Sequence, residues 1–207
     1  MFRGHVLAAG PGLDRSRRVA RSARGAAGRA PRRRTARSGA LLGGRLARAR
    51  AQRGDHVGPS PVNRGHPGSK HHLIVEAHGV PLAVTLTGGN RHDVTQLIPL
   101  LDAVPPIRGL RGRPRRKPRE LFADRGYDFD KYRRLLRARG ITPRIARRGV
   151  AHGSGLGKIR WVVERGFAWL HAFKRLRTRY ERRSDIHLGL LQLACSLICH
   201  RELAKSF

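Results

Sequence analysis

The sequence predicts an α/β domain with a mixed sheet flanked by helices, preceded by a disordered basic segment. Three observations lead to this prediction: composition changes near residue 54, apolar runs then alternate with helical patterns, and two of those runs form a hairpin pattern. Strands that alternate with helices favour parallel pairing, whereas a hairpin needs antiparallel pairing. The sheet is therefore expected to be mixed.

Residues 1–53 consist mainly of Arg, Ala, Gly and Ser, and Asp14 is their sole acid. Such a stretch buries too little apolar surface to offset the entropy lost on ordering, so we expect disorder or loose helix. An Arg-rich, acid-poor start is also typical of an organelle transit peptide. The folded domain is expected to span residues 54–207.

The first elements of that domain are a hairpin and a helix. Residues 71–77 and 81–87 are rich in Leu, Ile, Val and Thr, with a turn between them at His78 and Gly79. Asp93, three residues before Gln96, has the spacing of a capping box for the next helix. A basic, Pro-rich connector follows over residues 108–120 and is expected to be a surface loop.

The remaining elements alternate between strand and helix. ELFAD reads as a short buried strand that ends at Asp124, and FDKYRRLLRARG as a helix that Gly140 stops, with Phe129, Tyr132, Leu135 and Leu136 inward. ITPRIARR is expected to form another strand. KIRWVVERGFAWLHAFKRLRTRYERR reads as one long helix, and LGLLQLACSLICHREL as a buried one. Cys195 and Cys199 in that last helix are expected to be core residues of a protein from a reducing compartment.

The net charge indicates a polyanionic partner. The 207 residues contain 45 Lys and Arg against 13 Asp and Glu, a formal net charge of +32. Nucleic acid is the default partner of so basic a chain, and an anionic membrane surface is the weaker alternative. No apolar run is long enough to cross a membrane.

Asp124 is the acid that most needs a chemical explanation. It follows the apolar residues Leu121, Phe122 and Ala123, at the carboxyl end of a strand, where open α/β sheets present functional groups. Burial there would need compensation by a metal ion or by arginines. Asp128 and Asp130 follow the turn and are interpreted as turn and helix-cap residues.

Glu164 is the second candidate carboxylate. Arg160, Glu164, Ala168, His171 and Arg175 recur at helical spacing along one side of the long helix, and most of the rest of its surface is apolar, including Trp161. A plain surface pair of Arg160 with Glu164 explains this spacing equally well. Cutting a phosphodiester, by contrast, uses metal ions, commonly two Mg²⁺, held by carboxylates from distant segments. Arg125, Arg160, His171, Lys174 and Arg175 would then contact the phosphates of DNA.

Four phrases in this order resemble the insertion-sequence-five family of bacterial DDE transposases: GPSPVNRGHPGSKHHLI, GVPLAVTLTGGNRHDVTQL, ADRGYD and GLGKIRWVVERGFAWLHAFKRL. The resemblance covers residues 54 to about 204. It implies an RNase H-like fold, Mg²⁺-dependent cleavage at transposon ends, and attack of a 3′ hydroxyl on target DNA. It also implies a bacterial, cytoplasmic, nucleoid-associated protein. Its partners would be the terminal inverted repeats and the target DNA, and a homodimer on DNA is compatible with the resemblance.

The same resemblance assigns roles to individual residues. Asp124 corresponds to the second acid of the family's metal-binding triad and Glu164 to the third. Of the family's tyrosine, arginine, glutamate and lysine signature, Arg160 matches the arginine. Gly157 stands at the position of the signature tyrosine and His171 at that of the signature lysine. Lys174 or Arg175 would then take the place of the missing lysine.

The departure from the family lies upstream. Where relatives carry the first acid in a phrase like DSSHVRA, this chain has RLARARA, with Arg45 at the aspartate position. We therefore expect residues 54–207 to be a catalytic domain that lacks its first strand and is inactive or nearly so. Residues before about Ala51 would be read from the wrong frame of a GC-rich gene, or belong to a natural partial frame. Asp55 is the nearest acid, but it is expected to lie in a loop.

Two other classes of protein remain open. In the first, the chain is a non-enzymatic DNA-binding protein, whose net positive charge alone accounts for DNA binding and whose acids cap turns. In the second, it is an organelle-targeted or ribosomal basic protein. Metal-dependent nicking of DNA would separate the enzyme from both.

Overall fold

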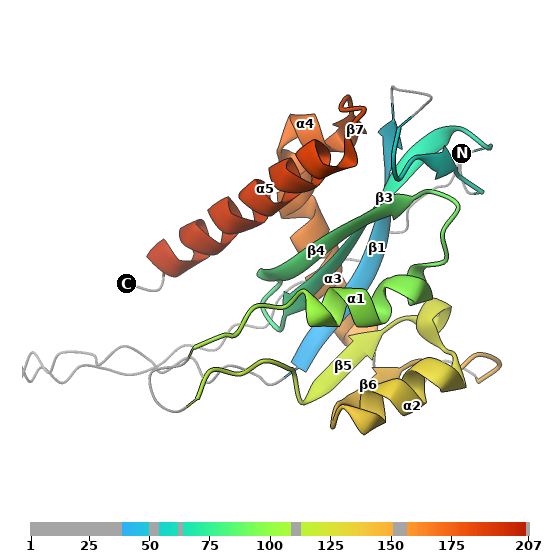
Figure 1. Ribbon diagram of the computed structural model, residues 1–207. Coiled ribbons are helices and arrows are strands. Elements are labelled where there is room, and N and C mark those ends of the chain that lie inside the picture. Colours follow the sequence, from blue (N-terminus) through green and yellow to red (C-terminus); the bar gives the residue numbers. More distant parts are fainter. Residues whose placement is uncertain (1–38, 50–53, 62–63, 109–112, 151–156, 206–207) are drawn as a thin grey trace, which may run out of the picture. The chain divides into compact units, whose positions relative to one another are not determined.

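The computed structural model describes residues 39–49, 54–61, 64–108, 113–150 and 157–205 (Figure 1). Disorder or loose helix was predicted for residues 1–53: residues 1–38 and 50–53 fall outside this part of the chain, whereas residues 39–49 form a strand. Among the helices described, none combines the length and the apolar character that crossing a membrane requires.

The described strands form one mixed sheet. Their order is β2-β3-β1-β5-β6, while β4 also pairs with β3 and β7 with β1. β1 runs antiparallel to β3 and parallel to β5, which confirms the prediction of a mixed sheet. The strands are β1 (Gly39–Ala49), β2 (Gly58–Pro59), β3 (Pro67–Glu76), β4 (Pro81–Gly88), β5 (Glu120–Ala123), β6 (Thr142–Ile145) and β7 (Thr178–Arg179).

Helices cover both faces of this sheet (Figure 1). Alternate residues of a strand belong to two different hydrophobic clusters, one on each face of the sheet, because successive side chains of a strand point to opposite faces. Leu42 belongs to the cluster under α1 and α2, and Leu41 to the cluster under α3, α4 and α5. The helices are η1 (Asp93–Gln96), α1 (Leu97–Asp102), η2 (Arg125–Tyr127), α2 (Asp130–Ala138), α3 (Gly157–Ala172), α4 (Lys174–Arg177) and α5 (Ser184–Ala204).

The expectation that the domain begins at residue 54 and lacks its first strand is wrong. β1 lies in the interior of the sheet, between β3 and β5. Ala40, Leu41 and Leu42 are buried on its two faces. The prediction failed because it judged residues 39–49 by their own composition, whereas nine residue pairs with β3 supply the backbone partners for this strand.

Most of the other elements agree with the sequence. The hairpin is β3 and β4, and its turn residue Gly79 has φ +84°. β5, α2 and β6 form where predicted, and Gly140, with φ +69°, follows the end of α2. Within the 108–120 connector, Arg108 and residues 113–119 lie outside the sheet, with one isolated bridge between Ile107 and Arg115, and Glu120 already begins β5.

The predicted long helix is wrong beyond Ala172. Phe173 takes an extended conformation, α4 is a single turn, and the chain then forms β7 beside β1. The cause is Arg179, which is buried. Its guanidinium donates to the Ser69 hydroxyl and to the carbonyls of His56, Glu181 and Arg182. These acceptors stabilise the break, and helical periodicity cannot reveal them.

Three smaller expectations also need correction. The capping box does not form: Asp93 instead pairs with Lys70 at 2.8 Å. Leu135 is 40% exposed and Trp161 is 50% exposed, so neither is a core residue. α5 is buried on one face: Cys195 is buried and Cys199 half-buried, while Leu193, Leu197 and Leu203 are exposed.

Candidate active site

Asp124 lies at the carboxyl end of β5 as predicted, but it is exposed. Its carboxylate Oδ1 accepts a hydrogen bond of 2.8 Å from the backbone N–H of Gly126 and so caps η2. Phe122 packs in the cluster under α3, and the residue two positions on in an extended chain points to the same face. Asp124 is thus directed to the side of the sheet that α3 covers.

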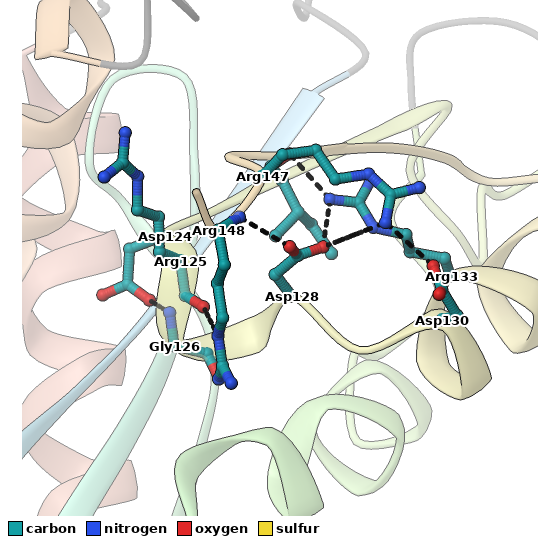
Figure 2. A network of polar contacts seen from close by, with 9 residues as sticks. Asp124, Arg125, Gly126, Asp128, Asp130, Arg133, Arg147 and Arg148 are labelled. Atoms are coloured by element: carbon teal, nitrogen blue, oxygen red, sulfur yellow. Dashed lines mark hydrogen bonds and ion pairs between the residues drawn. The ribbon is translucent and has the colours of Figure 1, made fainter. Parts of the chain in front are cut away.

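Asp128 is more than the turn residue that the sequence suggested. Its Oδ1 accepts bonds of 2.8 and 2.6 Å from the Arg133 guanidinium, and both side chains are nearly buried (Figure 2). Its Oδ2 accepts from the backbone N–H of Arg148 at 2.8 Å. Burial raises the pKa of Asp128, but the bonds from Arg148 and Arg133 outweigh burial and lower the pKa overall.

Arg148 and Arg125 fasten the turn after Asp124 to the loop after β6. Arg148 donates to the carbonyls of Arg125 and Gly126 at 3.0 and 3.3 Å, and Arg125 donates to the carbonyl of Val150 at 2.7 Å. In Figure 2 the Asp124 carboxylate points away from this arginine cluster. The turn is therefore held by its backbone, which leaves the Asp124 carboxylate at the surface. This arrangement was not predicted from the sequence, because the repeated arginines do not indicate which of them would pair.

Glu164 lies on the flank of α3 that faces β5. Gly166 of α3 faces β3, because a Cβ atom added to it would lie 2.8 Å from a β3 side chain. Val163 of α3 faces β1, because a Cβ atom added to Gly43 of β1 would lie 2.6 Å from it. At 100° per residue, the order around the helix is Gly166, Val163, Phe167, Glu164. The order across the sheet is β3, β1, β5. Glu164 comes after the helix positions that face β3 and β1, so it is turned toward β5.

The immediate partner of Glu164 is Arg160. The two side chains form an exposed ion pair of 3.0 Å, the surface pair that the sequence left open. Such a pair contributes little to stability. The predicted stripe ends at His171, because Arg175 belongs to α4 and pairs with Glu181 at 2.7 Å. Lys174 is exposed.

Arg45 lies on the same face of the sheet as these acids. Its Cα partner across β1 and β3 is His71, whose ring centroid is 5.7 Å from that of His171 in α3. Cross-strand partners point to the same face, so Arg45, which is exposed, projects toward α3. Burial and the nearby Arg45 and Arg177 lower the pKa of His171.

A buried hydrogen-bonded chain, which was not predicted from the sequence, lies on the same face of the sheet as Arg45. His187 Nδ1 is 2.9 Å from a carboxylate oxygen of Glu181, and His187 Nε2 is 3.0 Å from His71 Nε2. Because the carboxylate accepts the Nδ1 proton, neutral His187 accepts at Nε2 and His71 donates. The available signal was the pair His71 and His72 within a predicted strand, which must point to opposite faces.

The structure brings together fewer metal ligands than the resemblance implies. Within the described ranges no group of three His, Cys, Asp or Glu side chains could hold a metal ion. Asp124 and Glu164 are exposed acids directed to one side of the sheet, and Arg45 occupies the position where the resemblance implies the first acid. Asp55 is exposed and precedes β2, outside the sheet.

Comparison with known proteins identifies the family of this chain. A family model described as the transposase DDE domain matches residues 44–199, so the chain belongs to the DDE transposase family. Over 150 residues it is 61% identical to a Burkholderia cepacia protein, named as the presumed transposase for insertion sequence element IS402. The match covers 72% of this chain and 71% of that relative. The predicted insertion-sequence DDE transposase is confirmed, while membership of the insertion-sequence-five family stays a prediction.

Proposed function

We propose that this chain is the DNA-processing domain of an insertion-sequence transposase, in a form that binds double-stranded DNA but cleaves it poorly or not at all. The DNA would be the terminal inverted repeats of the element and its target. The observation that carries the proposal is the rotation of α3, which turns Glu164 toward β5, the strand that ends at Asp124. Two acids from distant segments on one side of a sheet suit phosphodiester chemistry.

The residues present fit a two-metal site only in part. DDE transposases work with divalent metal ions, and Mg²⁺ is the ion that exposed carboxylates would take. Asp124 and Glu164 would be its ligands, but the third position holds Arg45, whose cation opposes metal binding. The cleavage reaction therefore lacks part of its site in this chain.

The arginines around the acids suit contacts to the DNA backbone. Arg160 and Lys174 are exposed and would reach phosphates directly. Arg125 and Arg175 already bond to Val150 and Glu181, so we assign them a weaker share in DNA binding. His171 is half-buried and would act through its neighbours rather than as a strong contact.

A gain-of-function experiment tests this proposal. Supercoiled DNA that carries the element's ends is incubated with Mg²⁺ and either the native chain or Arg45→Asp, and nicking is followed on gels. We expect no nicking by the native chain and measurable nicking by Arg45→Asp. Adding Asp124→Asn or Glu164→Gln to the active variant should abolish it, whereas Asp130→Asn, an exposed acid nearby, should not.

Two results would refute the proposal. Robust nicking by the native chain that survives Asp124→Ala would show that Asp124 is not a metal ligand. An Arg45→Asp variant that folds and binds DNA but never nicks it would favour the non-enzymatic DNA-binding protein. Reading the upstream DNA in all frames would test the origin of residues 39–49: a DSSHVRA-like phrase in another frame is expected.

A further inference from the structure

Arg45 places a fixed positive charge where the family places a metal-binding acid. We infer that Arg45 forms a binding site for a phosphodiester of the DNA backbone, and that this site works without a metal ion. The inference rests on the proposed function, because DNA must first reach this face of the sheet. It assigns to the altered position a role in holding DNA.

Arg45 is available to a ligand. Its side chain is exposed, and no carboxylate in the described part of the chain forms an ion pair with it. A guanidinium presents two parallel N–H donors to a phosphate, a geometry that lysine lacks. The group can therefore bind one phosphodiester through two hydrogen bonds.

A second cation, Arg177, lies near Arg45: besides burial, the charges of both guanidinium groups lower the pKa of His171. Arg160 pairs with Glu164, and Arg177 donates to the carbonyl of His171 at 2.7 Å. The charges of Arg160 and Glu164 therefore offset each other, and the positive charges of Arg45 and Arg177 remain beside His171. An aspartate at position 45 would replace a positive charge by a negative one, and a phosphate would then need bound metal ions to approach.

The floor of the site is buried and uncharged. His71 is the cross-strand partner of Arg45 and lies within hydrogen-bonding distance of His187, which is bonded in turn to Glu181. Burial lowers the pKa of His71 and His187, so both imidazoles are neutral near pH 7. The positive charge that meets the phosphate is therefore that of Arg45, and the packed histidines fix the strand that carries it.

His171 provides a local probe for the ligand. Its ring lies against that of His71, so an anion bound at Arg45 should shift its imidazole resonances. The experiment titrates the native chain with a thymidine dinucleotide, which has one phosphodiester, in EDTA and follows His171 by NMR. We expect a saturable shift. Arg45→Ala should weaken the apparent affinity about tenfold or more, as expected for a lost charged hydrogen bond.

Matched variants separate this site from general charge effects. Arg137 is exposed on α2, on the opposite face of the sheet, and Arg137→Ala should bind the dinucleotide like the native chain. Arg45→Lys keeps the charge without the paired donors and should bind at an intermediate affinity. It also tests the site if Arg45→Ala does not fold. In Arg45→Asp, the shift should require added Mg²⁺.

Distinct results overturn the inference and the proposed function. A native chain that binds longer DNA in an anisotropy assay but shows no His171 shift refutes the Arg45 site alone. A shift that persists in Arg45→Ala also refutes it, since the phosphate would then lie elsewhere. If inorganic phosphate binds as tightly as the dinucleotide, the ligand of the site is a free anion and not the DNA backbone, which also refutes the inference. Failure to bind any DNA refutes the proposed function itself.

Discussion

Acid should destabilise this fold well above the pH at which carboxylates titrate, because four histidines are held neutral. Desolvation lowers the pKa of His71, His72, His171 and His187. For a histidine with a lowered pKa, the unfolded chain binds the proton first as pH falls. Stability is therefore full above pH 6.5 and is lost as the pH falls toward 4.

His72 gives the size of this effect. It is 1% exposed, its Nε2 lies 2.7 Å from the Thr87 hydroxyl, and burial lowers its pKa to about 4. With 6.5 for the unfolded chain, linkage predicts a loss of about 2 kcal/mol at pH 5 and about 3 kcal/mol at pH 4 from this group alone. Domains of this size are stable by roughly 5–15 kcal/mol, so the loss is large.

Urea denaturation at pH 7, 6 and 5 measures this loss. The variant His72→Gln keeps a polar group for Thr87 but cannot titrate, so its unfolding free energy should fall by about 2 kcal/mol less between pH 7 and 5. His200→Gln, at an exposed site on α5, is the control and should follow the native chain. Equal stability of the native chain at pH 7 and 5, or a His72→Gln variant as acid-sensitive as the native chain, would refute the reasoning.

Three further predictions concern packing and buried groups. Asp128→Asn should lower the free energy of unfolding by about 3 kcal/mol in urea, because it strands a buried guanidinium, whereas Asp102→Asn, in an exposed ion pair, should cost less than about 1 kcal/mol. Gly43→Ala should cost about 1–3 kcal/mol in the same assay, since its Cβ would meet Val163 at 2.6 Å. Burial raises the pKa of Cys195 to about 12, so its thiol should resist a thiol reagent at pH 8 until urea unfolds the chain.

Elements whose determinants are local could be predicted from the sequence. The β3–β4 hairpin has two β-branched runs and Gly79 at its turn, and α2 has an apolar spacing and Gly140 after it. The end of β5 at Asp124 follows from the same kind of signal. In each case the residues that specify the element lie close together in the sequence.

Elements that depend on distant partners could not be predicted. The break at Phe173 is stabilised by Arg179, whose acceptors include His56 and Ser69, more than 100 residues earlier in the chain. The Asp128 carboxylate accepts a hydrogen bond from the backbone N–H of Arg148, 20 residues away. Such bonds leave no periodic trace, so sequence alone placed Asp128 in a turn without revealing its anchor.

The contrast between β1 and Arg45 follows from what each part of a strand requires. The hydrogen-bond ladder joins backbone groups, so it accepts many sequences, provided the faces stay apolar where they are covered. Leu41 and Leu42 meet that need, and Gly43 leaves room for Val163 of α3. Metal binding instead requires a carboxylate at one position. The β1 strand can therefore form with an arginine at position 45, although Arg45 supplies no carboxylate to a metal ion.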